Sequence, residues 1–171
     1  MSPTLQCPAC GARWHTAARR GRTEATETCL RCGGPLRDET DPLVVLERFL
    51  AAWHEGDIEV AVQLCHPEIE IAEIAELVPG HDTSFTGREG ARRWIELTAE
   101  LWDVEFRCEP CERRVLDEHS VESVGEIEAR SSGEHADFVV TRRSLWKVND
   151  GMLRRVEASV ARETAPGARQ A

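Results

Sequence analysis

Four cysteines near the start of the chain constrain its fold more than any other feature. They form two pairs, Cys7 with Cys10 and Cys29 with Cys32, with 18 residues between the pairs. Two residues inside a pair let both sulfurs reach one ion, and a connecting hairpin can bring the second pair to it. Because four thiolates fill a tetrahedral zinc site, this spacing predicts a structural zinc ribbon over residues 1–37, with no catalysis at the metal. Two disulfides or unpaired thiols are the alternative.

The predicted ribbon is too small to bury enough apolar surface to fold alone, so the metal would supply its stability. The first residues contain neither a basic region nor an apolar core, so the sequence predicts a cytoplasmic protein in which thiols stay reduced. No apolar run approaches the ~20 residues of a membrane span.

Charge is unevenly distributed along the chain. Residues 1–37 hold six arginines against two glutamates, whereas the remainder holds 15 basic and 29 acidic residues. A zinc ion with four thiolates would lower the charge of the ribbon by two, and the acidic remainder would repel a phosphate backbone. Nucleic acid is therefore not an expected partner, and a protein partner for the ribbon is the alternative role for this segment.

Helix and strand signals fill the rest of the chain. After a polar linker at 38–41, Asp41 and Pro42 are typical of a helix start, and Asp57 begins a second, short helix. The strand-like stretch 68–77 alternates at first, and a capping box at 86–89 predicts a third helix. Four strands are expected at about 104–116, 120–131, 136–148 and 152–162, before a frayed tail at 164–171. The order predicts an α+β domain over 42–163, with three helices on a curved antiparallel sheet that encloses a pocket.

Several stretches in this domain resemble the nuclear transport factor 2-like superfamily, in its SnoaL-like (polyketide cyclase type) branch. They are LERFLAAWHEGD at 46–57, HPEIE at 66–70, FTGREG at 85–90 and LWKVNDGML at 145–153. The resemblance implies a cone of helices on a curved sheet and dimers that associate sheet to sheet. The functions it implies include ketosteroid isomerisation, aldol cyclisation, epoxide hydrolysis and ligand binding, so the fold alone does not choose among them.

The chain departs from the catalytic residues of that family. Ile71 stands where the resemblance implies an aspartate in ketosteroid isomerases, and the sequence contains no tyrosine for their oxyanion hole. Ser144 occupies the position of a histidine found in many SnoaL-like chains, and Ser159 and Ala161 replace a tyrosine and an aspartate. These departures favour a small-molecule-binding or regulatory role over catalysis.

Asp150 and Gly151 predict a two-residue turn, which sets the register of the last hairpin. That register places Trp146 opposite Arg155, Ser144 opposite Glu157, and Arg142 opposite Ser159, all on one face. A polar cluster in an apolar lining is typical of a ligand site. The predicted ligand-binding residues are Arg142, Ser144, Trp146, Glu157 and Ser159. An Arg142–Glu157 pair that only orders the sheet is the alternative.

The opposite face of this hairpin carries an apolar stripe in the same register, made of Val139, Leu145, Val156 and Val160. Nothing else in the chain is left to cover it, so the stripe predicts a homodimer, with scattered solvent-exposed valines as the alternative.

An enzyme of the isomerase, cyclase or hydrolase type is the rival interpretation of the pocket. Its candidate catalytic residues are Glu157 and the loop pair His81 and Asp82. The carboxylates of Glu68, Glu70, Glu73 and Glu76 are expected to be mostly solvated, with one or two pointing inward. A third cysteine pair, Cys108 and Cys111, falls in a predicted strand, where the two side chains would point to opposite faces and share a metal poorly.

Overall fold

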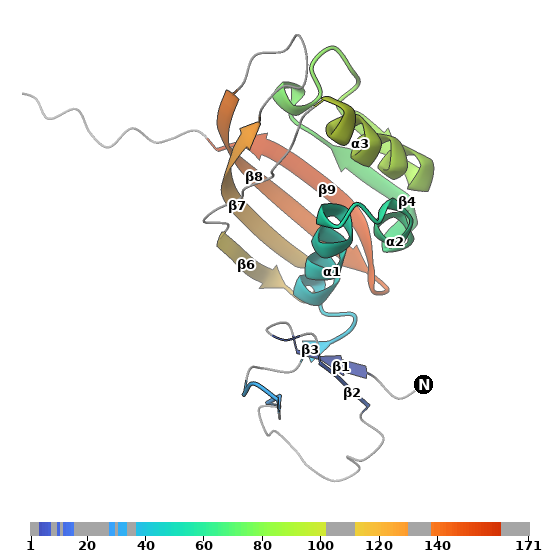
Figure 1. Cartoon of the computed structure of the whole chain (residues 1–171), viewed down its shortest axis with the longest axis vertical. Coiled ribbons are helices and arrows are strands. Elements are labelled where there is room, and N and C mark those ends of the chain that lie inside the picture. Colours follow the sequence, from blue (N-terminus) through green and yellow to red (C-terminus); the bar gives the residue numbers. More distant parts are fainter. Residues whose placement is uncertain are drawn as a thin grey trace, which may run out of the picture.

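The computed structural model describes residues 4–7, 10, 12–15, 28–29, 31–33, 37–101, 112–129 and 138–161. The N-terminal part forms a small antiparallel sheet of β1 (Thr4–Gln6), β2 (Arg13–His15) and β3 (Arg37–Asp38), in the order β2-β1-β3. It lies beyond the start of the first helix, at one end of the larger domain (Figure 1). The Cys108–Cys111 pair, the part of the predicted strand 104–116 before residue 112, and the tail at 164–171 fall outside the described residues.

Three α-helices follow where the sequence predicts them: α1 (Pro42–His54), α2 (Ile58–Gln63) and α3 (Gly87–Leu101). The carboxylate of Asp41 accepts the N–H of Leu43, and that of Asp57 accepts the N–H of Val60, so both act as N-caps. None of the described helices is long and apolar enough to cross a membrane.

The second sheet has six strands in the order β5-β4-β9-β8-β7-β6. They are β4 (Cys65–Ala72), β5 (Ser84–Thr86), β6 (Glu112–Asp117), β7 (Ser120–Ala129), β8 (Phe138–Asn149) and β9 (Met152–Val160). A short 3-10 helix, η2 (Ala75–Leu77), follows β4. The sheet is mixed, because β4 runs parallel to β9 while the other pairs are antiparallel. The prediction of a wholly antiparallel sheet is therefore wrong. A helix and several strands separate β4 from β9, which is a connection long enough for parallel pairing.

The helices cover one face of this sheet (Figure 1), and aromatic rings fill the space between them. Phe49 of α1 stacks on Trp94 of α3, with 6.2 Å between ring centroids, and contacts Trp146 of β8 at 6.1 Å. Trp53 packs edge-on against Trp94 at 4.6 Å. Because Phe49, Trp94 and Trp146 are almost completely buried, they fix the helices against the sheet.

The β8–β9 hairpin turns at Asp150 and Gly151, as predicted, with φ angles of 50° and 72°. A β-bulge then changes its register: Lys147 pairs with Arg155, but Val148 pairs with Leu153, so Arg154 is an extra residue on β9. Beyond the bulge the predicted pairs are wrong. The observed pairs are Trp146 with Val156, Ser144 with Ala158, and Arg142 with Val160. A one-residue shift exchanges the two faces of a strand, so Arg155, Glu157 and Ser159 lie on the outer face of the sheet.

The same shift divides the apolar stripe that predicted a dimer. Val156 is 1% exposed and belongs to the core, whereas Val139 is 61% exposed on the outer side. Ion pairs cross this outer face, including Arg114 with Glu122 at 3.2 Å. The outer face is therefore mostly charged. Of the four residues in the predicted apolar stripe, only Val139 and Leu145 lie on it.

Residues 38–41, which the sequence predicts as a polar linker, form a hydrogen-bonded turn that leads from β3 into α1. The backbone N–H and the hydroxyl of Thr40 donate to the carboxylate of Asp38 at 2.8 and 2.7 Å. Arg37 Nη1 contacts Asp41 Oδ2 at 3.0 Å, so the last ribbon strand is tied to the cap of α1. Thr40 also packs near Gly151, where a Cβ would lie 3.2 Å from its methyl group.

Candidate functional site

The four N-terminal cysteines meet at one point. Their Sγ atoms all lie within 4.8 Å of one another. Two of the sulfur pairs join one knuckle to the other: Cys7 to Cys32 at 3.4 Å and Cys10 to Cys29 at 3.6 Å. In a tetrahedral site with Zn–S bonds of about 2.3 Å, neighbouring sulfurs are about 3.8 Å apart. The cluster is therefore compatible with one metal ion held by four thiolates.

Local bonds favour the thiolate form of Cys29. Burial raises the pKa of this thiol, but the backbone N–H groups of Arg31 and Cys32 and the thiols of Cys10 and Cys32 lower it to about 6. The Arg31 N–H donates to Cys29 Sγ at 3.4 Å. The thiolate is the form that binds metals.

A second polar cluster lies inside the larger domain, where Glu73 and Arg142 form a buried ion pair. The side chain of Glu73 is 1% exposed and that of Arg142 is 9% exposed. Arg142 Nε donates to Glu73 Oε1 at 3.1 Å, and Nη2 donates to Oε2 at 2.6 Å. Such a bidentate pair offsets the cost of removing both charges from water.

Two further donors complete the environment of Glu73. The indole N–H of Trp94 donates to Oε2 at 3.1 Å, and the backbone N–H of Ile74 donates to Oε1 at 2.9 Å. Each carboxylate oxygen thus accepts two hydrogen bonds. This carboxylate is an anchor for Arg142 and Trp94, and it has little capacity left to accept a proton from a substrate.

The inward position of Glu73 has a sequence signal. Glu73 lies two positions after the buried Ile71 and four after the buried Ile69, and strand alternation would place all three on one face. Glu68 and Glu70 are exposed, as expected of a mostly solvated group. The partner of Glu73 is 69 residues away in the sequence, so no local pattern could identify it.

Three of the five predicted ligand-binding residues lie together on the inner face of β8. Arg142 is 8% exposed, Ser144 1% and Trp146 2%. The Trp146 indole N–H donates to Ser123 Oγ at 2.8 Å, and the Arg142 guanidinium carbon lies 5.9 Å from the centre of the Trp146 ring. The predicted partner of Arg142, Glu157, is replaced in this role by Glu73.

The remaining candidates lie elsewhere. Glu157 faces outward opposite Leu145, and its carboxylate contacts Arg155 Nε at 2.5 Å. Ser159 is exposed opposite Arg143. His81 and Asp82 are exposed in the loop between η2 and β5. The structure therefore does not bring any of the three candidate catalytic residues to the Glu73–Arg142 pair.

A small apolar cluster, which we call the apolar end group, adjoins Arg142. Its buried members are Ile74, Leu77 and Ile127, with Leu101, Val140 and Ala158 packed against them. Val140 pairs with Ile127, and it is the neighbour of Arg142 on the inner face of β8, two residues before it in the sequence. Arg142 thus lies between the apolar end group and Trp146. A charged donor therefore lies beside apolar side chains on the inner side of the sheet.

A family model described as a SnoaL-like domain matches residues 46–156. The chain therefore belongs to the SnoaL-like family, and its fold is that of the nuclear transport factor 2-like proteins. No curated protein matches the chain.

Solved structures share this fold at low sequence identity. One is an NTF2-like protein from Burkholderia xenovorans LB400, with 17% identity and a TM-score of 0.61 over 72% of this chain and 89% of that chain. A protein named as a candidate polyketide cyclase from Xanthomonas campestris pv. campestris has 12% identity and a TM-score of 0.57, covering 70% and 90% of the two chains. TerC, crystallised with polyporic acid, has 16% identity and a TM-score of 0.56, covering 71% and 92%. At these identities the likeness concerns the fold alone.

Proposed function

We propose that the SnoaL-like domain binds a small, mostly apolar molecule where Arg142 meets the apolar end group. The buried Glu73–Arg142 pair beside these apolar side chains is the observation that carries the proposal. The pair uses Nε and Nη2 of Arg142, and Nη1 makes no hydrogen bond to another described residue, so in this proposal Nη1 donates to an acceptor oxygen on the ligand. Because Glu73 balances the charge of Arg142, the site favours a neutral oxygen such as a carbonyl over an anion.

Binding is favoured over catalysis by the state of the carboxylates. A general base needs a free lone pair within hydrogen-bond reach of the substrate, and the oxygens of Glu73 already accept four donors. The alternative is an enzyme of the isomerase, cyclase or hydrolase type. The polyketide cyclase name carried by one structure of this fold keeps that alternative worth testing.

The test uses a panel of ketosteroids, lactones and epoxides, measured for both binding and turnover. We expect binding by at least one apolar carbonyl compound without turnover. Replacing both members of the pair, Arg142→Leu with Glu73→Met, should preserve folding and abolish binding. Glu157→Gln on the outer face is the matched control and should bind as the wild type does. Turnover would establish the enzyme alternative, and wild-type binding by the double variant would make the pair purely structural.

We also propose that Cys7, Cys10, Cys29 and Cys32 hold one structural zinc ion. Four protein thiolates leave no coordination position for water or substrate, which supports a structural role. Metal analysis should find one zinc per chain, and Cys29→Ser should lose it. Cys65→Ser is the control: burial, opposed by Arg88, raises the pKa of the Cys65 thiol to about 12, so this residue does not compete for metal. A zinc-free wild-type protein would overturn the assignment.

We further propose that two copies associate through the outer face of the larger sheet, around Val139 and Leu145. Leu145 is flanked there by Glu157 and Glu122, its partners on the neighbouring strands. Leu145→Glu should produce monomers in sedimentation experiments, because association would bury a third negative charge between Glu122 and Glu157. A wild-type monomer at micromolar concentration would refute the dimer.

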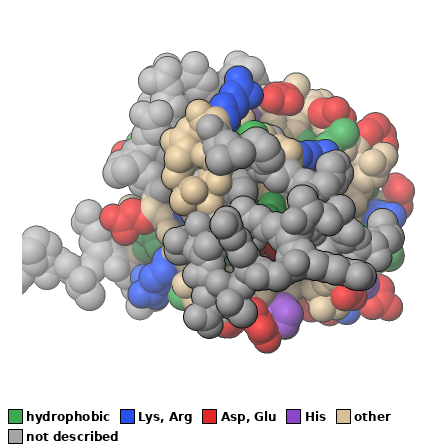
Figure 2. All heavy atoms as spheres, turned by 90° about the horizontal axis from the view of Figure 1, so that it is seen from below, with side chains coloured by type: hydrophobic (Ala, Val, Ile, Leu, Met, Phe, Trp, Pro, Cys, Tyr) green, Lys and Arg blue, Asp and Glu red, His purple; other side chains and the backbone are tan. Residues whose placement is uncertain are grey.

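The ribbon is proposed to engage a protein in the cytoplasm, and nucleic acid is the less suitable partner. Seen from the ribbon end, the described side chains at the margin include both acidic and basic groups (Figure 2). The whole chain carries a net charge of -10, which opposes binding to phosphates. Capture of interacting proteins by the full chain, compared with Cys29→Ser, tests this role. Equal capture by both would argue against the ribbon as the docking element.

A further inference from the structure

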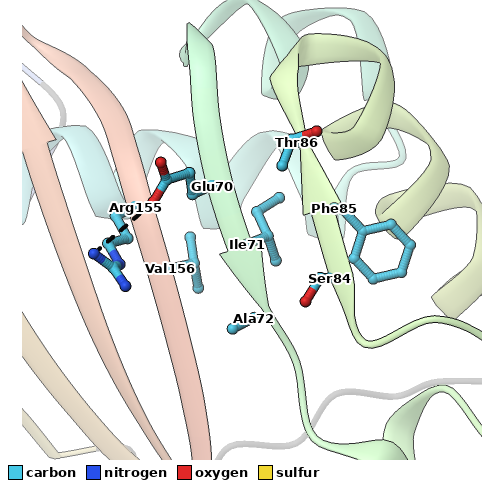
Figure 3. A pocket seen from close by; sticks show the side chains of 8 residues that line it. All are labelled: Glu70, Ile71, Ala72, Ser84, Phe85, Thr86, Arg155 and Val156. Atoms are coloured by element: carbon cyan, nitrogen blue, oxygen red, sulfur yellow. Dashed lines mark ion pairs between the residues drawn. The ribbon is translucent and has the colours of Figure 1, made fainter.

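A hollow of about 230 Å³ opens on the outer face of the larger sheet, between β4, β5 and β9 (Figure 3). It arises because Ala72 is a short side chain in a row of longer ones. Ala72 pairs with Ser84 on β5 and with Glu157 on β9. In the next row, Glu70 lies between Thr86 and Arg155. The hollow is therefore built by the register of three strands, on the face opposite the helices.

The polar groups around the hollow have unused hydrogen-bonding capacity. Glu70 Oε2 lies 3.8 Å from Arg155 Nη1, too far for a hydrogen bond, and the Glu70 side chain is 56% exposed. The hydroxyls of Ser84 and Thr86 have no hydrogen-bond partner within the described part of the chain. A carboxylate, a guanidinium and two hydroxyls thus face one small space.

Arg155 is held in position for this role. Its Nε contacts Glu157 Oε1 at 2.5 Å, which fixes one edge of the guanidinium, and Nη1 lies on the side of Glu70. In Figure 3 the side chains of Glu70 and Arg155 approach each other, whereas the ring of Phe85 points to the other side of β5. The hollow therefore presents one negative and one positive group and no aromatic ring.

We infer that this hollow binds a small zwitterion, a molecule with an ammonium group and a carboxylate like a free amino acid. The ammonium group donates to Glu70, and the carboxylate accepts from the terminal nitrogens of Arg155. Ser84 and Thr86 supply hydroxyls to either group. A simple anion would meet the charge of Glu70, and a simple cation that of Arg155, so each is selected against. This site is separate from the proposed binding site at Arg142, which lies on the inner face of the sheet, and it shares the outer face with the proposed dimer surface.

The experiment titrates the full-length protein with glycine and follows backbone amide signals by NMR. We expect saturable shifts at Ala72, Ser84 and Thr86. Acetate and methylammonium, which each carry one of the two charges, should bind at least tenfold more weakly. Ala72→Leu fills the hollow from an exposed position and should weaken glycine binding at least tenfold. Ser159→Leu adds the same side chain at another outer position and should leave binding unchanged.

Glu70→Gln gives a second variant that keeps the size of the side chain and removes its charge. It should also weaken glycine binding at least tenfold, whether or not Ala72→Leu folds. The inference is overturned if glycine produces no saturable shifts. It is equally overturned if acetate binds as well as glycine, which would indicate an anion site on Arg155, or if Glu70→Gln binds as the wild type does.

Discussion

The ribbon and the SnoaL-like domain are stabilised in different ways. In the described part of residues 1–41, the buried hydrophobic side chains are Cys7 and Cys29, both proposed metal ligands. The larger domain buries a continuous core in which Phe49, Trp94 and Trp146 contact one another. One region thus buries a single cluster of sulfurs, whose stabilisation by zinc is proposed, and the other buries apolar contacts distributed over helices and sheet.

The difference shows what each region can tolerate. A core of many contacts can lose one of them and remain folded, whereas a metal site loses its geometry when one ligand is removed. The two regions are nevertheless joined by specific contacts, since Arg37 binds Asp41, which caps α1, and Thr40 lies beside Gly151 of the β8–β9 turn. How far the two regions depend on each other is therefore open to measurement.

Removing the metal should give the largest effect. We expect a chelator to unfold the ribbon and leave the larger domain folded, because the domain core contains none of the four cysteines. Structural zinc contributes on the order of 10 kcal/mol to such sites. Hydrogen exchange should show lost protection in β1, β2 and β3 only. Simultaneous loss of protection in α1 and β8 would show that the two regions fold as one unit.

Breaking the buried ion pair should have the next largest effect, now within the larger domain. Glu73→Ala leaves the Arg142 guanidinium buried without its partner, which should cost about 3–5 kcal/mol in urea denaturation. Glu157→Ala on the outer face is the matched control and should cost under about 1 kcal/mol. The double change Glu73→Met with Arg142→Leu should recover most of the loss. Equal effects of the two single variants would contradict the burial of the pair.

The sequence allowed the local features of both regions to be predicted. The caps Asp41 and Asp57 mark the starts of α1 and α2, and the turn at Asp150 and Gly151 is where the sequence places it. The spacing of the cysteines likewise predicted that their sulfurs would meet. Each of these features depends on residues close in sequence or on the known geometry of one ion.

The features that depend on distant residues could not be predicted in this way. The bulge falls where Arg154 and Arg155 stand side by side between the buried Leu153 and Val156, a break in alternation that the predicted register did not include, and it moves Glu157 to the outer face. The parallel pairing of β4 with β9 and the contact of Glu73 with Arg142 join segments far apart in the sequence. The face of Arg142 was predicted correctly because the extra residue lies on β9 and the alternation of β8 is unbroken, whereas its partner Glu73 follows the end of β4.

A smaller effect is expected at the junction of the two regions. Asp41 caps α1 and also binds Arg37, so Asp41→Ala should remove both interactions and cost about 1 kcal/mol. Asp41→Asn retains a capping oxygen and loses only the charge, which should cost less than the alanine change. Urea denaturation of the domain and zinc affinity of the ribbon are measured on both variants. If Asp41→Ala weakened zinc binding and Asp41→Asn did not, the link between the two regions would be the helix cap at Asp41 and not its ion pair with Arg37.

The smallest effect concerns Glu47 of α1, whose carboxylate lies 3.5 Å from Arg113. Burial raises the pKa of Glu47, and nearby Asp41 adds to this, although Arg113 and Arg37 oppose it. A carboxyl whose pKa is raised in the folded protein binds its proton more tightly there than in the unfolded chain. At neutral pH the group is ionised in both states, and its charge then lowers the stability of the fold by the largest amount. Its unfavourable contribution should disappear as the pH falls through the raised pKa toward 4.5, its ordinary value. Glu47→Gln should remove this dependence, which melting temperatures between neutral pH and 4.5 would measure. An unchanged pH profile would mean that solvent screens Glu47 at this junction.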